Sequence, residues 1–202
     1  MSTVRCEFGL TAVGGKIYAI GGWNDSFALK SVEAYDPQLG AWALVASMSV
    51  ERSDHATVVI DRKIYTMGGM DNEEAILDTV EVYDPQADSW QRVASMPQAL
   101  HAHAAAAMGG KIYVTGGYAQ GSLVNSVCVY DPQADAWTQL ASMSCARRSH
   151  ASAAVAGKLY VFGGVGDGGN LDTAEVYDPA SNSWAQGPSL TSTRSSFVAI
   201  AL

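Results

Sequence analysis

The sequence has few of the residues that build disulfide frameworks or metal sites. It holds three cysteines and four histidines in 202 residues. Cys6, Cys128 and Cys145 form no Cys-x-x-Cys pair, and their odd number argues against both a disulfide framework and a zinc site. We expect neither a metal nor another cofactor.

Long apolar runs and excess positive charge are also missing. The hydrophobic segments are short and interrupted, so none is expected to span a bilayer. Residues 1–5 lack the basic region and apolar run of a secretory signal, which predicts a cytoplasmic protein. The net charge of −8 argues against binding to nucleic acid or to an acidic membrane.

Common catalytic signatures are absent as well. The sequence contains no Gly-x-Ser-x-Gly motif, P-loop or dinucleotide fingerprint, and its glycine-rich stretch at 163–169 lacks the Lys-Ser/Thr pair of a phosphate site. No segment shows a sustained 3.6-residue period, so helix is not expected. The residues predict an all-β protein without catalysis of its own.

What the sequence does have is one motif repeated four times. Tyr-Asp-Pro begins at Tyr35, Tyr83, Tyr130 and Tyr177, and a tryptophan follows each tyrosine by seven residues. A Gly-Gly pair precedes each tyrosine, and equivalent residues are 47 or 48 positions apart. This period predicts one structural unit copied along a single domain, with repeats at about 1–47, 48–95, 96–142 and 143–189 and a tail at 190–202.

The second repeat divides into four short strands, which we call A to D. Strand A is expected at 55–60 and strand B at 63–67, where Gly68 and Gly69 end it. Strand C is expected at 79–83 and strand D at 90–94. Four antiparallel strands with a recurrent aromatic residue make one blade of a β-propeller. The fold predicted is therefore four blades plus a surplus C-terminal strand.

These residues resemble the kelch repeat. Gly-Lys-Ile-Tyr-Ala-Ile-Gly-Gly at 15–22, the Tyr-Asp-Pro motif, the tryptophan and Met48-x-x-x-Arg52 match it, and all four copies do so in register. Leu100 replaces the arginine in the third copy, and Leu190 replaces the methionine after the fourth. The resemblance implies a kelch-type propeller.

The tail leaves ring closure open, because residues 194–200 repeat the segment at 5–11. The tail could complete the first blade of a four-bladed ring, or it could add to an edge of a ring that closes without it. Alternatively, two copies share edges. The chain is thus expected to be a monomer or a homodimer that shares blade edges.

One face of the propeller is the better candidate for binding. The loops between strands B and C, here B–C loops, are long and vary between copies, and they emerge on the same face as the segments from strand D to the next strand A, here D–A segments. Binding residues concentrate on variable loops of a rigid scaffold. The predicted partner-binding residues are Trp23, Asp25, Arg52, Met70, Asp71, Glu73, Tyr118, Gln120, Arg147, Arg148, Val165 and Asp167.

Within this set, Trp23 and Tyr118 directly follow their glycine pairs and are the best anchor candidates. The arginines have two interpretations. Arg5, Arg52, Arg147 and Arg194 recur at one repeat position, which favours a structural role at least as much as a grip on a partner carboxylate. Arg148 lies outside the pattern and is the better functional candidate.

The histidines are interpreted as packing residues. His55, His103 and His150 share one repeat position, where Phe8 and Phe197 stand in other copies, so a packing role is favoured over a metal site. A further residue, His101, breaks the repeat pattern and has no acid or nucleophile at a useful spacing.

Resemblance also guides the prediction of function. Kelch domains with this pattern are typical of BTB-kelch adaptors, which hold substrates for cullin-based ubiquitin ligases, so we expect a module that binds a protein or peptide. The chain lacks BTB and BACK regions, so alone it would recognise a substrate without recruiting a ligase. The alternatives are a sugar-modifying enzyme, either an isomerase or an oxidase, and an actin-binding kelch protein.

Overall fold

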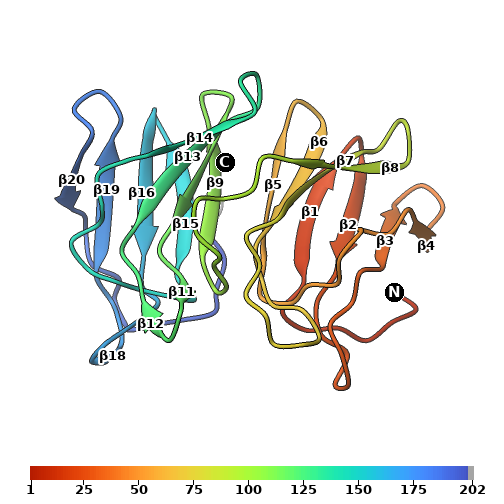
Figure 1. Cartoon of the computed structure of the whole chain (residues 1–202), viewed down its shortest axis with the longest axis horizontal. Helices are drawn as coiled ribbons and strands as arrows, with labels where there is room; N and C mark the ends of the chain where they lie inside the picture. Colours follow the sequence, from red (N-terminus) through yellow and green to blue (C-terminus); the bar gives the residue numbers. More distant parts are fainter. Residues whose placement is uncertain (200–202) are drawn as a thin grey trace. The chain divides into compact units, whose positions relative to one another are not determined.

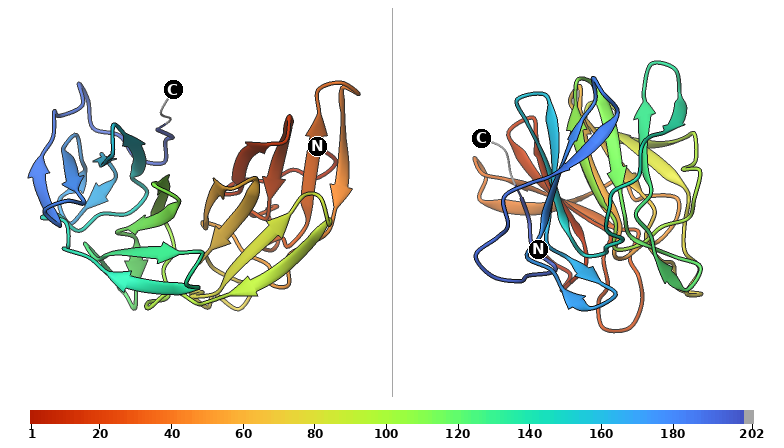
Figure 2. Two further views of the ribbon diagram at one scale, coloured as in Figure 1. Left: turned by 90° about the horizontal axis from the view of Figure 1, so that it is seen from above. Right: turned by 90° about the vertical axis from the view of Figure 1, so that its left-hand side faces the viewer.

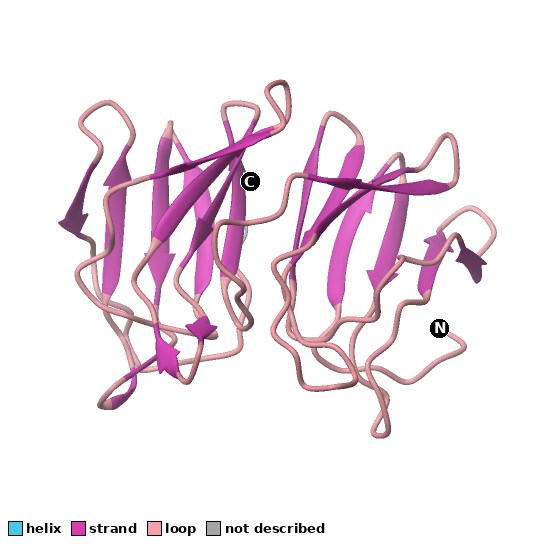
Figure 3. Cartoon of the chain, viewed as in Figure 1, coloured by secondary structure: helices cyan, strands magenta, loops and turns pink. Residues whose placement is uncertain are grey.

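The computed structural model describes residues 1–199, and within them it contains strands and loops but no helix (Figure 3). Accordingly, no helix of the described part is long and apolar enough to cross a membrane. The chain divides into two compact units, Met1–His101 and Ala102–Leu202. Each unit contains two four-stranded antiparallel sheets, one for each sequence repeat (Figure 1).

In the first unit, the first sheet has the order β1-β2-β3-β4 and the second has the order β5-β6-β7-β8. The strands are β1 (Gly9–Val13), β2 (Lys16–Ile20), β3 (Val32–Asp36), β4 (Ala41–Val45), β5 (Ala56–Ile60), β6 (Lys63–Met67), β7 (Val80–Asp84) and β8 (Ser89–Val93). Strands β5 to β8 correspond to strands A to D and begin within one residue of the predicted positions.

In the second unit, the third sheet has the order β9-β10-β13-β14 and the fourth has the order β15-β16-β19-β20. Their strands are β9 (Ala104–Met108), β10 (Lys111–Thr115), β13 (Val127–Asp131), β14 (Ala136–Gln139), β15 (Ala151–Val155), β16 (Lys158–Phe162), β19 (Ala174–Asp178) and β20 (Ser183–Gln186). The two B–C loops of this unit fold into small hairpins, which the sequence did not predict. They consist of β11 (Tyr118–Ala119) with β12 (Ser122–Leu123), and β17 (Val165–Gly166) with β18 (Gly169–Asn170).

Figure 2 shows the sheets of each unit from two further directions. Large side chains fill the space between the two sheets of each unit. In the first unit, Tyr18 and Ile20 of the first sheet pack with Ile64 and Tyr83 of the second. In the second unit, Tyr113 and Val129 of the third sheet form the equivalent cluster with the fourth. Tyr83 and Tyr177, two copies of the repeated tyrosine, thus belong to cores that neither sheet of a unit forms alone.

The C-terminal tail behaves differently from its prediction as a surplus strand. Residues 190–199 form no strand, and residues 200–202 of that prediction lie outside the described part of the chain. The backbone of Arg194 nevertheless bonds to the fourth sheet, because its N–H donates to Leu171 and its carbonyl accepts from Gly164. Arg52 makes the same two contacts to Leu29 and Gly22.

Candidate functional site

Three of the four recurring arginines are structural, which corrects part of the predicted binding set; the fourth, Arg194, is exposed. The side chains of Arg5, Arg52 and Arg147 have no exposed surface. Because a side chain without exposed surface cannot grip a partner, Arg52 and Arg147 do not belong to a binding face.

Each buried arginine fastens one sheet from within. Arg52 Nη1 donates to the carbonyls of Gly68 at 2.7 Å and Thr79 at 3.1 Å, and Nη2 donates to Glu81 Oε1 at 2.9 Å. The other Glu81 oxygen accepts from the amide of Ser49 at 2.8 Å. The arginine therefore ties the D–A segment to the end of strand B and to strand C. Arg5 and Arg147 repeat the arrangement with Glu33 and Glu175.

The third copy replaces both members of this ion pair. Leu100 stands at the arginine position and Cys128 at the glutamate position, and both are buried. Burial raises the pKa of the Cys128 thiol to about 12, so it is neutral. Losing both charges together avoids leaving one buried and unpaired.

Three of the residues that directly follow a glycine pair are joined to a D–A segment through their backbone. Trp23 exchanges two backbone hydrogen bonds with Cys6, at 2.8 and 2.9 Å. Met70 does the same with Ser53, and Val165 with Arg148. The variable position that sequence analysis selected is thus held against the neighbouring D–A segment at the end of the sheet.

The glycine pair makes this close approach possible. Gly69 has a φ of +95°, and a Cβ built there would lie 2.5 Å from the carbonyl oxygen of Ser53. The second glycine of the first copy, Gly22, has the same φ and the same conflict with the carbonyl of Cys6. Only glycine accommodates both the left-handed backbone and the neighbouring carbonyl.

In the first unit, the acidic loop residues divide into two kinds. Asp71 Oδ1 accepts from the amides of Glu73 and Ala75, each at 2.9 Å, so this carboxylate shapes its own loop. Asp25 and Glu73 are exposed. Trp23 and Met70 are half-buried, which leaves part of each side chain accessible.

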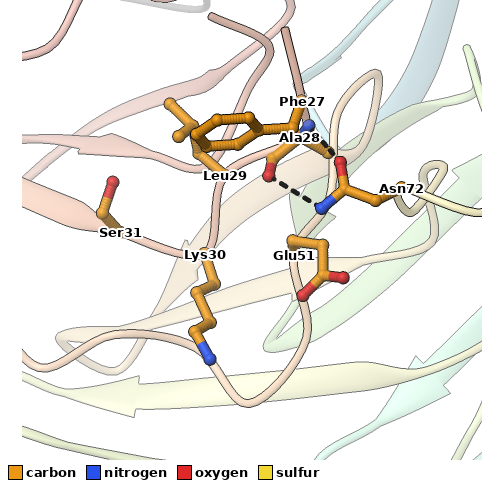
Figure 4. A pocket seen from close by; sticks show the side chains of 7 residues that line it. All are labelled: Phe27, Ala28, Leu29, Lys30, Ser31, Glu51 and Asn72. Carbon is orange, nitrogen blue, oxygen red and sulfur yellow. Dashed lines mark hydrogen bonds between the residues drawn. The ribbon is translucent and has the colours of Figure 1, made fainter.

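Sequence analysis missed a hollow beside these loops, with a volume of about 260 Å³ (Figure 4). Asn72 borders it and joins the two B–C loops of the first unit, accepting from the amide of Ala28 at 2.5 Å and donating to its carbonyl at 3.3 Å. Phe27, which is half exposed, also lines the hollow. The remaining lining residues are Leu29, Lys30, Ser31 and Glu51. The variability of the B–C loops is the only sequence signal that indicated the region of this hollow.

In the second unit, three predicted residues lie together. The guanidinium carbon of Arg148 is 5.6 Å from the centre of the Tyr118 ring, within the range of a cation–π contact. Val165 pairs with Arg148 through the backbone. Gln120 and Asp167 are exposed in the turns of the two hairpins. The structure therefore groups Tyr118, Arg148 and Val165 at one end of this unit.

One of the three recurring histidines, His150, forms polar packing contacts. His150 Nε2 lies 2.9 Å from the Thr115 hydroxyl, which lies 2.9 Å from the Ser152 hydroxyl, and all three residues are buried. Burial, with the nearby charge of Arg147, lowers the pKa of His150 to about 3. Among residues 1–199, no three His, Cys, Asp or Glu side chains gather as metal ligands.

His101 does have an acid beside it, contrary to the sequence interpretation. Its Nδ1 lies 3.0 Å from Asp54 Oδ2, although the two residues are 47 positions apart. Burial, followed by the charge of Asp54, raises the pKa of the nearby Glu7. Sequence spacing could not reveal this group, because Glu7 and Asp54 come from equivalent positions of adjacent copies.

The sheets and their repeated contacts define a kelch-repeat β-propeller. The family model of the KLHDC2/KLHL20/DRC7 Kelch-repeats domain matches residues 7–195, and the chain therefore belongs to the kelch-repeat family.

Curated relatives are similar over short stretches. Human Kelch-like protein 33 is 36% identical over 69 residues, covering 34% of this chain and 13% of that protein. Zebrafish (Danio rerio) Kelch-like protein 15 is 34% identical over 77 residues, covering 35% and 13%. Kelch repeat-containing protein kel-10 of Caenorhabditis elegans is 47% identical over 55 residues, covering 27% and 10%. Each match spans a small part of a longer protein.

The fold is also that of a solved structure, YjhT. The two superimpose with a TM-score of 0.86 over 96% of this chain and 73% of YjhT, at 16% identity. At this identity the likeness concerns the fold alone.

Proposed function

We propose that the chain is a protein-interaction module that binds a partner protein or peptide through its B–C loops and D–A segments, as the substrate-recognition domains of cullin-based ubiquitin-ligase adaptors do. The observation that carries the proposal is the contact between Tyr118 and Arg148. An aromatic ring and an arginine held together on a rigid scaffold are the residue types that concentrate binding energy at interfaces. Similarity to Kelch-like proteins supports the same class of function.

The chemistry of this pair favours a partner that carries a carboxylate beside an apolar side chain. The Arg148 guanidinium has no salt bridge within the described residues, so its donors can meet a carboxylate. The Tyr118 ring and the Val165 side chain supply adjacent apolar surface. A peptide with an acidic residue next to a hydrophobic one would match both the guanidinium and this apolar surface.

The test is a fluorescence-polarisation screen of acidic–hydrophobic peptides. Tyr118→Ala and Arg148→Ala are each expected to weaken binding by at least about tenfold. Lys158→Ala is the matched control, since it removes a cation at the opposite end of the same unit and is expected to leave affinity unchanged. Equal binding by all three variants would contradict the proposal.

A catalytic role would use a different group. The pair of His101 and Asp54, with Glu7 nearby, has the residue types of a general acid–base site, and it favours the sugar-modifying alternative. Saturable turnover of a small sugar that is lost in Asp54→Asn but retained in Tyr118→Ala would support that alternative. Absence of turnover across a panel of sugars would leave the interaction module as the proposed function.

A further inference from the structure

A second hollow, with a volume of about 290 Å³, lies beside the fourth sheet of the second unit. It is bounded by the D–A segment that precedes this sheet, by the end of the B–C loop at 171–173 and by strands β19 and β20. Its lining includes Ser144, Arg147, Leu171, Glu175, Trp184 and Gln186. The indole of Trp184 donates to the carbonyl of Ala141 at 2.8 Å, so the tryptophan side of this hollow is the side that turns toward the third sheet.

Apolar surface and a free hydroxyl line this hollow together. Trp184 and Leu171 are both half-buried, which leaves part of each side chain accessible. The Ser144 hydroxyl makes no hydrogen bond within residues 1–199. Arg147 and Glu175 are paired at 3.0 Å, so their charges compensate each other. A ligand would therefore be held here by packing and hydrogen bonds rather than by net charge.

The second sheet carries an arginine of its own at the equivalent place. Arg92 of β8 lies directly across from Glu81 of β7 in the strand pairing. Its Nε donates to the hydroxyl of Ser49 at 3.1 Å, so the side chain reaches from the outer strand to the D–A segment. The structure thus shows which kind of side chain fits between this strand and this serine.

The fourth sheet keeps the serine and lacks the arginine. Ser144 is the equivalent of Ser49, because the amide of each serine donates to the buried glutamate of its own sheet, at 2.7 and 2.8 Å. Gln186 stands at the position of Arg92, directly across from Glu175. It is exposed, and its side chain makes no hydrogen bond in the described part of the chain. A serine hydroxyl without a guanidinium and an adjoining hollow are the result.

We propose that this second hollow is a seat for an arginine side chain of a partner protein. The guanidinium donates to the Ser144 hydroxyl, as it does in the second sheet, and the aliphatic stem packs on Trp184 and Leu171. A guanidinium suits the seat better than an ammonium group, because it is planar, weakly hydrated and stacks well on an indole.

The seat is separate from the contact between Tyr118 and Arg148. The inference rests on the proposed function only in that the arginine comes from a partner protein or peptide. A single arginine with both ends blocked tests the seat without the rest of a partner. The outcome is therefore independent of the screen with acidic–hydrophobic peptides.

The first test is a titration of the full chain with Nα-acetyl-L-arginine N-methylamide, followed by NMR through the indole N–H signals. The signal of Trp184, identified by its loss in Trp184→Phe, is expected to shift and to saturate with a dissociation constant of about 1–10 mM. Gln186→Arg places the chain's own arginine in the seat and is expected to weaken binding of the probe by at least about tenfold. The matching citrulline derivative, which has no charge, is expected to bind at least about fivefold more weakly.

The second test creates the same seat in the second sheet. Arg92→Gln removes the arginine from Ser49, and the indole signal of Trp90 is then expected to respond to the same arginine probe. Arg62→Gln is the matched control, since it removes an exposed arginine from the turn between β5 and β6. This control is expected to leave the Trp90 signal without a response.

Four results would overturn the proposal. They are a Trp184 signal that does not respond up to the solubility limit of the probe, a response that Gln186→Arg leaves unchanged, equal binding of the arginine and citrulline probes, and a Trp90 signal that stays unresponsive in Arg92→Gln. None of them would affect peptide binding at Tyr118 and Arg148. Conversely, a saturable response of Trp184 without binding of any acidic–hydrophobic peptide would refute the proposed peptide site and leave the arginine seat in place.

Discussion

The guanidinium of Arg52 lies 2.9 Å from the carboxylate of Glu81, and both side chains are essentially excluded from solvent. An ion pair buried in this way depends on both partners, because either charge alone would be stranded away from water. The pair connects the D–A segment to strand C, so the segment that borders the candidate binding face depends on it as well.

Replacing one partner of this ion pair is expected to lower the free energy of unfolding more than replacing both partners together. Arg52→Leu leaves Glu81 charged and unpaired, which should lower the free energy of unfolding by about 3–5 kcal/mol. Arg52→Leu with Glu81→Cys reproduces the residues of the third copy and should recover part of that loss. Urea unfolding at pH 7 measures both variants. A double variant no more stable than the single one would show that the third copy relies on other compensations.

The buried His150 is expected to make the protein sensitive to acid. Its pKa is about 3 in the folded state and about 6.5 when unfolded, so below pH 6.5 the unfolded chain binds a proton that the folded chain does not. Stability from this residue is therefore present above pH 6.5 and is lost as the pH falls toward 3, by about 1 kcal/mol between pH 6 and pH 5.

His150→Phe tests the origin of that loss, because phenylalanine occupies the equivalent positions 8 and 197. Thermal or urea unfolding of the variant should show a shallower decline between pH 6 and pH 5. Thr115→Val is the control, since it removes the hydroxyl beside His150 without removing a titrating group and should keep the decline. An unchanged slope in His150→Phe would assign the acid sensitivity to other residues.

The glycine after strand B is expected to tolerate no side chain. Gly69→Ala would bring a methyl group to 2.5 Å from the Ser53 carbonyl and strain a φ of +95°. Gly15→Ala is matched in backbone, with a φ of +78°, but has open space around its Cβ. We expect about 1–2 kcal/mol of destabilisation for Gly15→Ala and about 1–3 kcal/mol more for Gly69→Ala. Similar losses in the two variants would mean that the Ser53 carbonyl moves aside easily.

The repeat made most of the fold predictable. Strands such as β6 and β7 carry their own signals, an apolar alternation ended by Gly68 or by Asp84-Pro85, and these signals recur in register in every copy. The choice of Trp23 and Tyr118 also rested on position within the repeat, directly after the glycines. Both residues lie at the end of a sheet, as expected.

The remaining features depend on contacts between residues far apart in the chain. The repeat spacing shows that an arginine recurs at the position of Arg52, but not that its partner is Glu81, which lies 29 positions later. Likewise, His101 meets Asp54 only because adjacent copies stack. The hairpins β11–β12 and β17–β18 escaped prediction because their two-residue strands are too short to show an alternating pattern.

The final prediction concerns Asn72, whose amide group pairs with both backbone groups of Ala28 as a neighbouring strand would. Asn72→Asp keeps an acceptor for the Ala28 amide but turns a donor into a carboxylate oxygen that faces the Ala28 carbonyl, so the loop at 23–28 should open more often. Hydrogen exchange at Ala28 should become faster, while exchange in β2 stays unchanged, because the strand ladder does not involve Asn72. Glu73→Gln, which changes the exposed neighbour of Asn72, is the control. If Asn72→Asp leaves exchange at Ala28 at its original rate, the bridge does not hold the first B–C loop in place, and the hollow beside Phe27 would owe its shape to the loop backbone alone.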